Sequence, residues 1–219
     1  MDRAPGETRS WTALRRGTRP ADGSVFRRSG VRGLLALELS FMPLAGGGMP
    51  VPLVAASASE AIRKDTGVIS WLQWPDLVSI EGKAVGRAAV SKGPTGLTTA
   101  EITINCHAPL ESMRPEGMQP TSIRETLGVE IDVDLLREKL VHAFDWYLAE
   151  WERGMHRKMI DRIQPTIPWV GSVVEVLSDA GKARGTASGL GEGCALVVAR
   201  GRIRTAFMPE EVRFVRPVG

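Results

Sequence analysis

The sequence predicts an α/β (α+β) fold in which a mixed β-sheet with packed helices precedes a small β-barrel. Apolar residues recur every three or four positions from Asp132 or Asp134 to about Arg153, as in an amphipathic helix. Beyond Gln164–Pro168, short apolar stretches alternate with Gly, Asp and Lys turns. This stiff, polar connector therefore divides the chain into a first domain of residues 1–164 and a second of residues 168–219.

Strands and one helix are expected before the long helix. Small and apolar residues at helical spacing predict a helix over Val54–Lys64, with Gly67 as its C-terminal stop. The segment Leu97–Cys106 alternates polar with apolar residues, as a half-buried strand does. Further strands are predicted at Leu34–Met42, Val68–Leu72 and Leu77–Ile80, and a short one at Trp11–Leu14.

The long helix is expected to be part of the core. Asp132 and Asp134 supply capping and first-turn negative charge, and Gly154 follows the last turn. The apolar stripe is Leu135, Leu136, Leu140, Phe144, Leu148 and Trp151. His142 and His156 have no second ligand at metal-binding spacing, so both are interpreted as structural or surface residues.

The second domain is predicted to contain five short strands. They are Ser172–Leu177, Arg184–Leu190, Cys194–Ala199, Ile203–Met208 and Val212–Val215. Gly189–Gly193 resembles a phosphate loop in composition, but the helix that such a loop requires does not follow it, so a β-turn is expected. About fifty residues form only a marginal core, so this barrel should pack on the first domain.

Composition indicates an ordinary globular protein of the cytoplasm. The chain has 219 residues, of which 43% are hydrophobic and 24% charged. Its two cysteines do not make a disulfide framework and suit a reducing compartment. Glycines and prolines interrupt the most apolar stretch, residues 34–58, so no membrane span is expected. No signal peptide is indicated.

Positive charge is concentrated at the start of the chain. Residues 1–33 contain eight arginines against three acidic residues, a net charge of +5, which leaves −2 for the remainder of the +3 total. Such a segment can be a phosphate-binding loop, a nucleic-acid arm or a disordered tail. Because no aromatic residues alternate with the arginines, nucleic acid is the less favoured partner, and a loop that orders around an anionic small ligand is preferred.

The most informative stretch is Trp74-Pro75-Asp76, followed after six residues by Lys83-Ala84-Val85-Gly86. A rigid X-Pro turn lies between two strands, and a lysine precedes a glycine by three positions. The glycine would let a ligand approach the backbone, and a buried lysine would hold a carboxylate or phosphate. The alternative interpretation is an ordinary hairpin with a solvated lysine.

This block resembles the Lys-Trp-Pro-Asn-Asp … Lys-x-x-Gly signature of biotin protein ligases and their lipoate-ligase relatives. Ile102–Asn105 is similar to that family's Gly-Ile-Asn-Val strand. Thr121-Ser122-Ile123 before Leu127-Gly128 resembles its Ser-Leu segment, which precedes a long helix. The matches follow the family's order and extend from about Trp11 to the C-terminus.

The resemblance implies a catalytic module followed by an SH3-like barrel. Family members activate biotin with ATP and Mg²⁺ to give biotinyl-5′-AMP, and then transfer the biotinyl group to a lysine of a biotin carboxyl carrier protein. Lys83 matches the catalytic lysine, Gly86 the glycine beside biotin and Asn105 the asparagine that faces the nucleotide. Arg19 and Trp74 are further expected binding residues. Mg²⁺ would be held largely by phosphate oxygens. A homodimer formed through sheet edges is compatible with this resemblance.

Several family features are altered. The family's arginine-glycine loop falls on residues 18–26, where only Arg19 and Gly23 are retained and Phe26 replaces a tryptophan. Arg15 stands where the family has glutamine, and Gln73 replaces the lysine before Trp-Pro. The Ser-Thr-Asn turn with its helix and a winged-helix domain are absent, so a repressor role is unsupported.

Three functions therefore compete. The first is a divergent biotin protein ligase, favoured by Lys83, Gly86 and Asn105. The second is a catalytically degenerate relative that acts as a binding or partner subunit, favoured by the altered loop. The third is a different activity on the same scaffold, such as lipoate or octanoate transfer, or an unrelated α/β protein.

Overall fold

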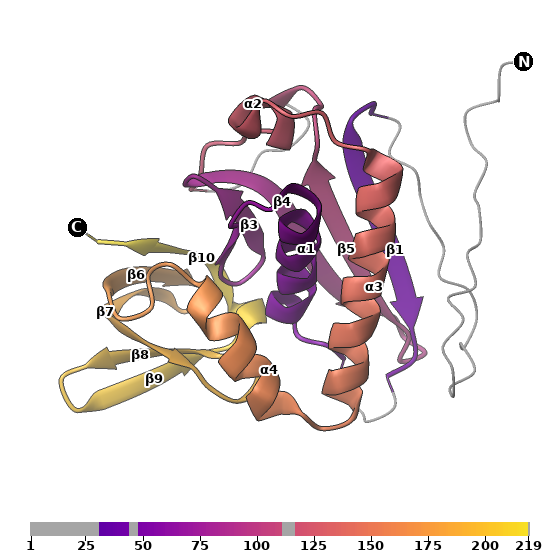
Figure 1. The fold of residues 1–219 in the computed structure, drawn as a ribbon. Coiled ribbons are helices and arrows are strands. Elements are labelled where there is room, and N and C mark those ends of the chain that lie inside the picture. The colour runs from indigo at the N-terminus through magenta and orange to yellow at the C-terminus, as the bar shows by residue number, and fades with distance from the viewer. Residues whose placement is uncertain (1–30, 44–47, 111–116, 219) are drawn as a thin grey trace, which may run out of the picture.

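The computed structural model describes residues 31–43, 48–110 and 117–218, and these form two five-stranded antiparallel sheets with helices (Figure 1). The predicted α+β class is confirmed. The first sheet has the order β1-β5-β4-β3-β2. Its strands are β1 (Leu34–Phe41), β2 (Trp71–Gln73), β3 (Leu77–Ile80), β4 (Lys83–Lys92) and β5 (Thr98–Asn105). A mixed sheet was expected, but all pairings of these strands are antiparallel, and Ala84–Pro120 is an isolated parallel bridge.

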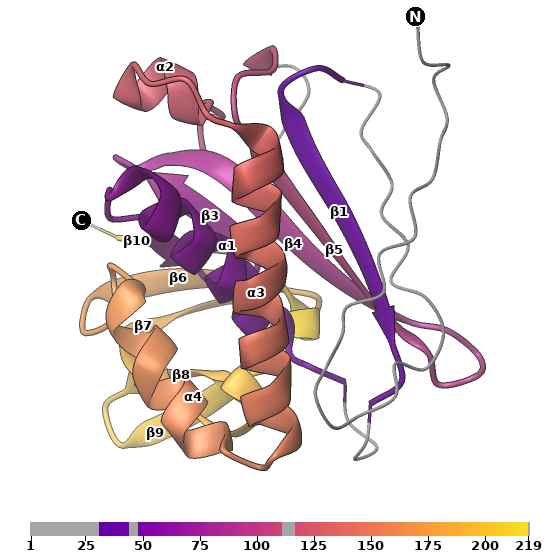
Figure 2. The ribbon, with the colours of Figure 1, turned by 45° about the vertical axis from the view of Figure 1, so that its right-hand side comes forward.

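Two helices cover one face of the first sheet. Helices α1 (Val51–Thr66) and α3 (Val133–Glu152) lie side by side on it, as Figure 2 shows. The alternation predicted for β5 buries Ala100, Ile102 and Ile104 toward these helices. On the other face the side chains are more accessible, and they include Glu38 and Glu101, which lie opposite each other.

The predicted helix signals are present. Gly67 ends α1 in the left-handed conformation, at φ 72°, and its N–H donates to the carbonyl of Arg63. Asp132 caps α3 by accepting hydrogen bonds from the N–H groups of Asp134 and Leu135. The apolar stripe of α3 is buried except at Leu135, which is 44% exposed because it lies on the solvent side of the first turn.

Two short helices were not predicted, α2 (Ile123–Leu127) and α4 (His156–Ile163). The residue before α4, Met155, makes no side-chain cap, and α4 opens with three polar residues. Its buried face is formed by Met159, Ile160 and Ile163. The expected connector begins with one 3₁₀ turn, η2 (Gln164–Thr166).

The last five strands form the second sheet, in the order β10-β6-β7-β8-β9. They are β6 (Val173–Ser178), β7 (Gly181–Leu190), β8 (Leu196–Arg200), β9 (Ile203–Phe207) and β10 (Val212–Pro217). The 3₁₀ turns η3 (Glu192–Cys194) and η4 (Pro209–Glu211) separate some of them. In the described part of the chain, β9 and β10 are unpaired edges, so the sheet is compatible with an SH3-like domain but is not seen as a closed barrel.

The two sheets pack together at the end of β2. The indole N–H of Trp74 donates to the carbonyl of Cys194 at 2.9 Å, and that of Trp169 donates to Oε1 of Gln73 at 3.0 Å. The buried apolar residues of both sheets form one continuous cluster. The second sheet therefore packs on the first, as its small size predicts.

Cys106 and Cys194 are both free and buried. Among the described residues, no helix is long and apolar enough to cross a membrane.

Candidate functional site

Lys83 begins β4 and is exposed. The preceding residues, Glu81 at φ 50° and Gly82 at φ 74°, form the left-handed turn that leads from β3 into β4. The next residue, Ala84, is paired on both sides: with Ser79 of β3, and with the segment at Pro120. The start of β4 is thus fixed between two chain segments, which gives Lys83 a firm backbone anchor and a free side chain.

Gly86 lies three residues further along β4, opposite Ile104 of β5. A Cβ atom at this position would be 3.0 Å from the carbonyl oxygen of Thr103 and 3.6 Å from Cβ of Val78. The close approach of the neighbouring strand therefore already favours a glycine here, independently of any ligand. That Gly86 also contacts a ligand stays a prediction.

Asn105 is the last residue of β5 and is fully buried. Its Oδ1 accepts a hydrogen bond from the N–H of Ala108 at 2.8 Å, which fixes the orientation of the amide. Its Nδ2 is buried and makes no hydrogen bond with the residues that the structure describes. A buried amide donor without an acceptor is costly, so this end of β5 favours an acceptor such as a nucleotide oxygen or nitrogen.

His107 lies beside the same strand end. Its Nδ1 is also buried, with no partner in the described part of the chain. Its ring packs against Gly33, whose carbonyl accepts the N–H groups of Cys106 and His107. Two unsatisfied polar groups thus occur within three residues of each other. Sequence reasoning did not single out His107, since only its burial marks it.

Trp74 and Pro75 form the turn between β2 and β3, joined by a cis peptide bond. The Trp74 side chain is only 2% exposed and bonds to Cys194, so its indole joins the two sheets. The turn lines a cavity of about 130 Å³ with Gly117, Met118 and the strand β10. Two arginines of β10 also line this cavity: Arg213, which pairs with Asp179 at 3.2 Å, and Arg216, which pairs with Glu175 at 2.7 Å.

Asp76 follows the turn and pairs with Arg87 of β4, with 2.8 Å between Oδ2 and Nε. Both residues line a larger cleft of about 880 Å³ between the start of α1, the second half of β4 and the second sheet. The pair was not predicted, because the two residues are eleven positions apart and only the strand register brings them together.

The described residues offer neither a thiolate nor a carboxylate cage. Burial raises the pKa of the Cys106 thiol to about 12, which makes it a poor nucleophile near neutral pH. No three His, Cys, Asp or Glu side chains of the described residues gather as a metal site. The cations near the candidate site among the described residues include Lys83 and Lys92, and the arginines Arg87, Arg213 and Arg216, each of which is already paired with a carboxylate.

The structure brings Lys83, Gly86 and Asn105 to the same end of neighbouring strands, while Trp74 lies beyond β3. Neither Lys83 nor Asn105 lines the two cavities described above. Arg19 lies outside the described residues. The roles of these five residues stay predictions.

Comparisons with known proteins identify the fold. No family model and no curated protein matches the sequence. Among solved structures, the biotin protein ligase of Aquifex aeolicus has a TM-score of 0.74 and 21% identity over 85% of this chain and 83% of that chain. The same enzyme in complex with biotin and ATP has a TM-score of 0.73 and 20% identity, over 85% of this chain and 79% of that chain. A biotin protein ligase-like protein of unknown function from Silicibacter has a TM-score of 0.64 and 14% identity, over 80% of this chain and 78% of that chain.

The chain therefore has the fold of the biotin protein ligases. The likeness extends over both sheets, since it covers most of each chain. This confirms the fold that the sequence resemblance implied.

Proposed function

We propose that this chain is a divergent biotin protein ligase, which activates biotin with ATP and transfers the biotinyl group to a lysine of a carrier protein. The observation that carries the proposal is the convergence of Lys83, Gly86 and Asn105 at one end of β4 and β5, where the buried Nδ2 of Asn105 has no acceptor among the described residues. The likeness to a ligase with biotin and ATP bound supports it.

The proposed reaction brings two anions together. The biotin carboxylate attacks the α-phosphorus of ATP, pyrophosphate leaves, and a lysine amine of the carrier then attacks the acyl carbon and releases AMP. The ammonium of Lys83 would offset the repulsion between carboxylate and phosphate and stabilise the charge of the transition state. Nδ2 of Asn105 would donate to the nucleotide.

Mg²⁺ would neutralise charge on the phosphates when it is bound. Since the described residues form no cluster of metal ligands, the ion would be held mainly by phosphate oxygens. Arg19 would contribute from the head of the chain by closing over the adenylate and excluding water from this labile anhydride.

A catalytically degenerate binding subunit is the second candidate. Lys83 is exposed and lines neither cavity described above, and the carboxylate of Asp76 is already paired with Arg87. In this function the scaffold would hold a ligand or partner without turnover.

The test is transfer of labelled biotin to a carrier-protein lysine in the presence of ATP and Mg²⁺, with lipoate as a parallel substrate. We expect Lys83→Met to lower the rate by about 10²-fold or more, as loss of a transition-state charge does. Lys64→Met, in the last turn of α1 and outside the cavities described above, is the matched control and should retain activity.

Thermal stability with biotin, lipoate or ATP separates the alternatives, because a specific ligand stabilises the folded state. If a ligand raises the melting temperature but no transfer occurs, the ligase proposal is wrong and the chain is a binding subunit. Transfer of lipoate in place of biotin would contradict the substrate. Transfer that Lys83→Met leaves unchanged would contradict the role of Lys83.

We further propose that residues 1–164 carry the reaction and that residues 168–219 form a second domain that supports it. The change from helices to short strands after η2 and the arginines that β10 contributes beside the Trp74–Pro75 turn support this division.

A further inference from the structure

Strand β9 is an edge of the second sheet: it pairs with β8 along one side, and its other side is open. Four of its five residues are exposed, and Ile203 is 69% exposed. Among the described residues, nothing pairs with the free side of β9. The β8–β9 hairpin projects from the molecule at the lower left of Figure 1.

The register identifies the backbone groups of β9 that are free. A two-residue turn joins Arg200 to its partner Ile203, so this pair closes the hairpin with hydrogen bonds. Hydrogen-bonded and non-bonded pairs alternate along an antiparallel ladder, so Arg204 and Ala206 direct their N–H and C=O groups outward. These groups can pair with another extended backbone.

Positive charge lies on β9, on its hairpin turn and on the next two strands of the sheet. Five exposed cations, here called the hairpin cluster, lie on β7, β8, β9 and the turn; they are Lys182, Arg184, Arg200, Arg202 and Arg204. None forms an ion pair with an acidic residue in the part of the chain that the structure describes. The acidic residues of β6 and of the turn after it, Glu175 and Asp179, pair instead with Arg216 and Arg213 of β10.

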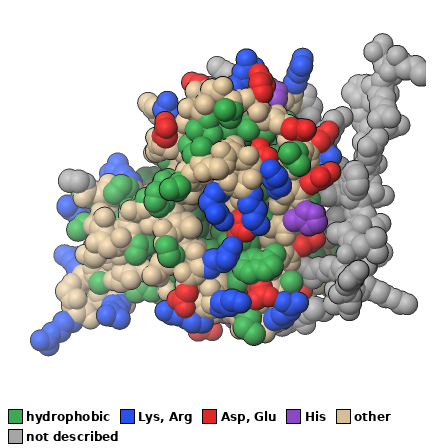
Figure 3. All heavy atoms as spheres, in the orientation of Figure 1, with side chains coloured by type: hydrophobic (Ala, Val, Ile, Leu, Met, Phe, Trp, Pro, Cys, Tyr) green, Lys and Arg blue, Asp and Glu red, His purple; other side chains and the backbone are tan. Residues whose placement is uncertain are grey.

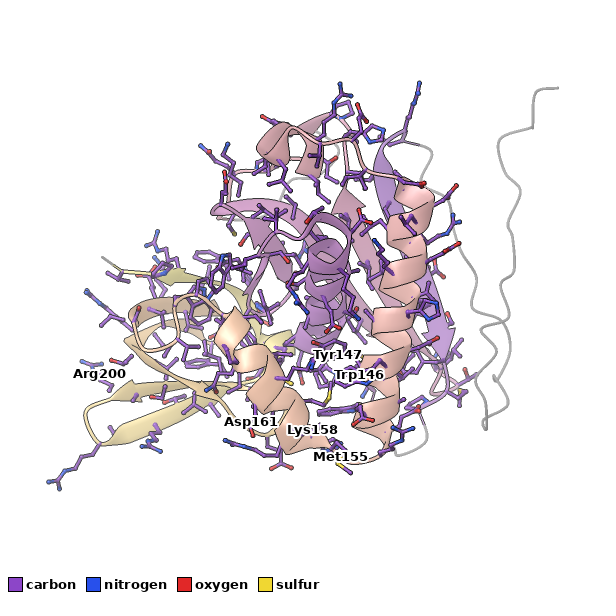
Figure 4. The ribbon with its side chains drawn as sticks, in the orientation of Figure 1. Trp146, Tyr147, Met155, Lys158, Asp161 and Arg200 are labelled. Atoms are coloured by element: carbon purple, nitrogen blue, oxygen red, sulfur yellow. The ribbon has the colours of Figure 1, made fainter. Side chains whose placement is uncertain are left out.

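The cluster lies at one end of the molecule. Figure 4 shows Arg200 there, away from the labelled residues of α3 and α4, and Figure 3 shows blue side chains projecting over the same end. It is separate from the end of β4 where Lys83, Gly86 and Asn105 meet.

We propose that β9 docks an extended, acidic segment of a partner protein, which adds a strand to the second sheet. Main-chain pairing with Arg204 and Ala206 would supply the affinity, and carboxylates of the segment would face the hairpin cluster. A second copy of this chain is disfavoured, because pairing β9 with itself would bring Arg202 and Arg204 near their own equivalents.

The chemistry of the edge favours a polypeptide over a nucleic acid. A strand edge offers alternating backbone donors and acceptors that only another backbone can satisfy in register. Nucleic-acid platforms combine cations with exposed aromatic side chains, and none of the large exposed side chains of the second sheet is aromatic among the described residues.

The test is fluorescence anisotropy of the full chain with a labelled synthetic peptide in which Glu alternates with Thr or Val. Its matched control is the same peptide N-methylated at every residue, which retains every charge and offers no N–H group for strand pairing on either edge. We expect the unmodified peptide to bind and N-methylation to weaken binding about tenfold, equivalent to about 1.4 kcal/mol.

Two protein variants test the two parts of the site. Arg200→Gln with Arg202→Gln and Arg204→Gln should weaken binding about tenfold, whereas Arg63→Gln with Arg153→Gln and Arg157→Gln, an equal charge change elsewhere, should not. Ala206→Pro removes one outward N–H at unchanged charge and should weaken binding as N-methylation does, since proline is tolerated at an edge position.

Absence of binding, or equal binding of the methylated peptide, would overturn the proposal. The surface would instead be a nucleic-acid site if single-stranded RNA of equal charge binds more tightly than the peptide. In that case the three Arg→Gln changes should abolish RNA binding, and Ala206→Pro should leave it unchanged. Circular dichroism of each variant checks the fold, and the N-methylated peptide decides the question even if Ala206→Pro does not fold.

Discussion

The amide of Asn105 makes one hydrogen bond within the fold through its oxygen, while its nitrogen makes none with the described residues. Its Oδ1 accepts a hydrogen bond from the N–H of Ala108, while its Nδ2 is buried and has no partner among the described residues. Thr98, at the other end of β5, has a buried hydroxyl that also makes no hydrogen bond with the described residues. The Oδ1 of Asn105 therefore stabilises the fold through a hydrogen bond, whereas the hydroxyl of Thr98 does not.

We expect Asn105→Ala to lower the free energy of unfolding by about 1–3 kcal/mol, because the N–H of Ala108 loses its acceptor. Thr98→Val should leave stability unchanged or raise it by up to about 1 kcal/mol, because it removes an unsatisfied hydroxyl from the interior. Urea unfolding at neutral pH measures both. A larger loss for Thr98→Val than for Asn105→Ala would show that the two assignments are reversed.

Residues of the candidate site could be predicted where the neighbouring sequence forms a recognisable turn or strand pattern. Lys83 and Gly86 stand out because a turn and a strand pattern surround them, and Asn105 because it ends an alternating segment. The pair of Asp76 with Arg87 and the approach of Arg213 depend on strand register and on contacts between sheets, which no local pattern contains.

A helix or strand was predicted more accurately where its ends carry clear capping residues and its interior a regular apolar pattern. The long helix has an acidic cap at Asp132 and a regular apolar stripe, and its observed start at Val133 lies within one residue of that cap. Helix α4 has no side-chain cap at Met155 and buries only three residues, so its sequence pattern resembles a polar connector. Strand β2 was predicted at Val68–Leu72 but is Trp71–Gln73, because it pairs only with the short β3.

The cap of α3 makes a prediction at this scale. Asp132→Ala should lower the free energy of unfolding by about 1 kcal/mol, because Oδ1 of Asp132 accepts hydrogen bonds from the N–H groups of Asp134 and Leu135. Asp132→Asn retains an acceptor and is the matched control, with a smaller expected loss. Equal losses for the two variants, measured in urea, would show that charge rather than the hydrogen bonds stabilises this helix end.

At the scale of the whole molecule, the two sheets share one interior. The indole N–H groups of Trp74 and Trp169 make hydrogen bonds to Cys194 and Gln73, so each crosses from one sheet to the other. Sequence periodicity predicted where the second sheet begins, since the strand pattern changes at the connector. It could not predict that the interior is continuous, because that property arises from contacts between residues about a hundred positions apart.

A continuous interior predicts that residues 168–219 do not fold alone. A chain of this length buries a smaller fraction of its surface on folding than a larger domain does, and it is correspondingly marginal in stability. Separation would also expose Cys194, which is fully buried beside Trp74 in the intact protein. We expect the isolated segment to show no cooperative thermal transition by circular dichroism and a narrow spread of amide proton shifts. The full chain, as control, should unfold in a single transition that tryptophan fluorescence and circular dichroism report together. A folded, cooperative segment would show instead that the second sheet is stable by itself, and that its packing on β2 serves orientation of the arginines of β10 rather than stability.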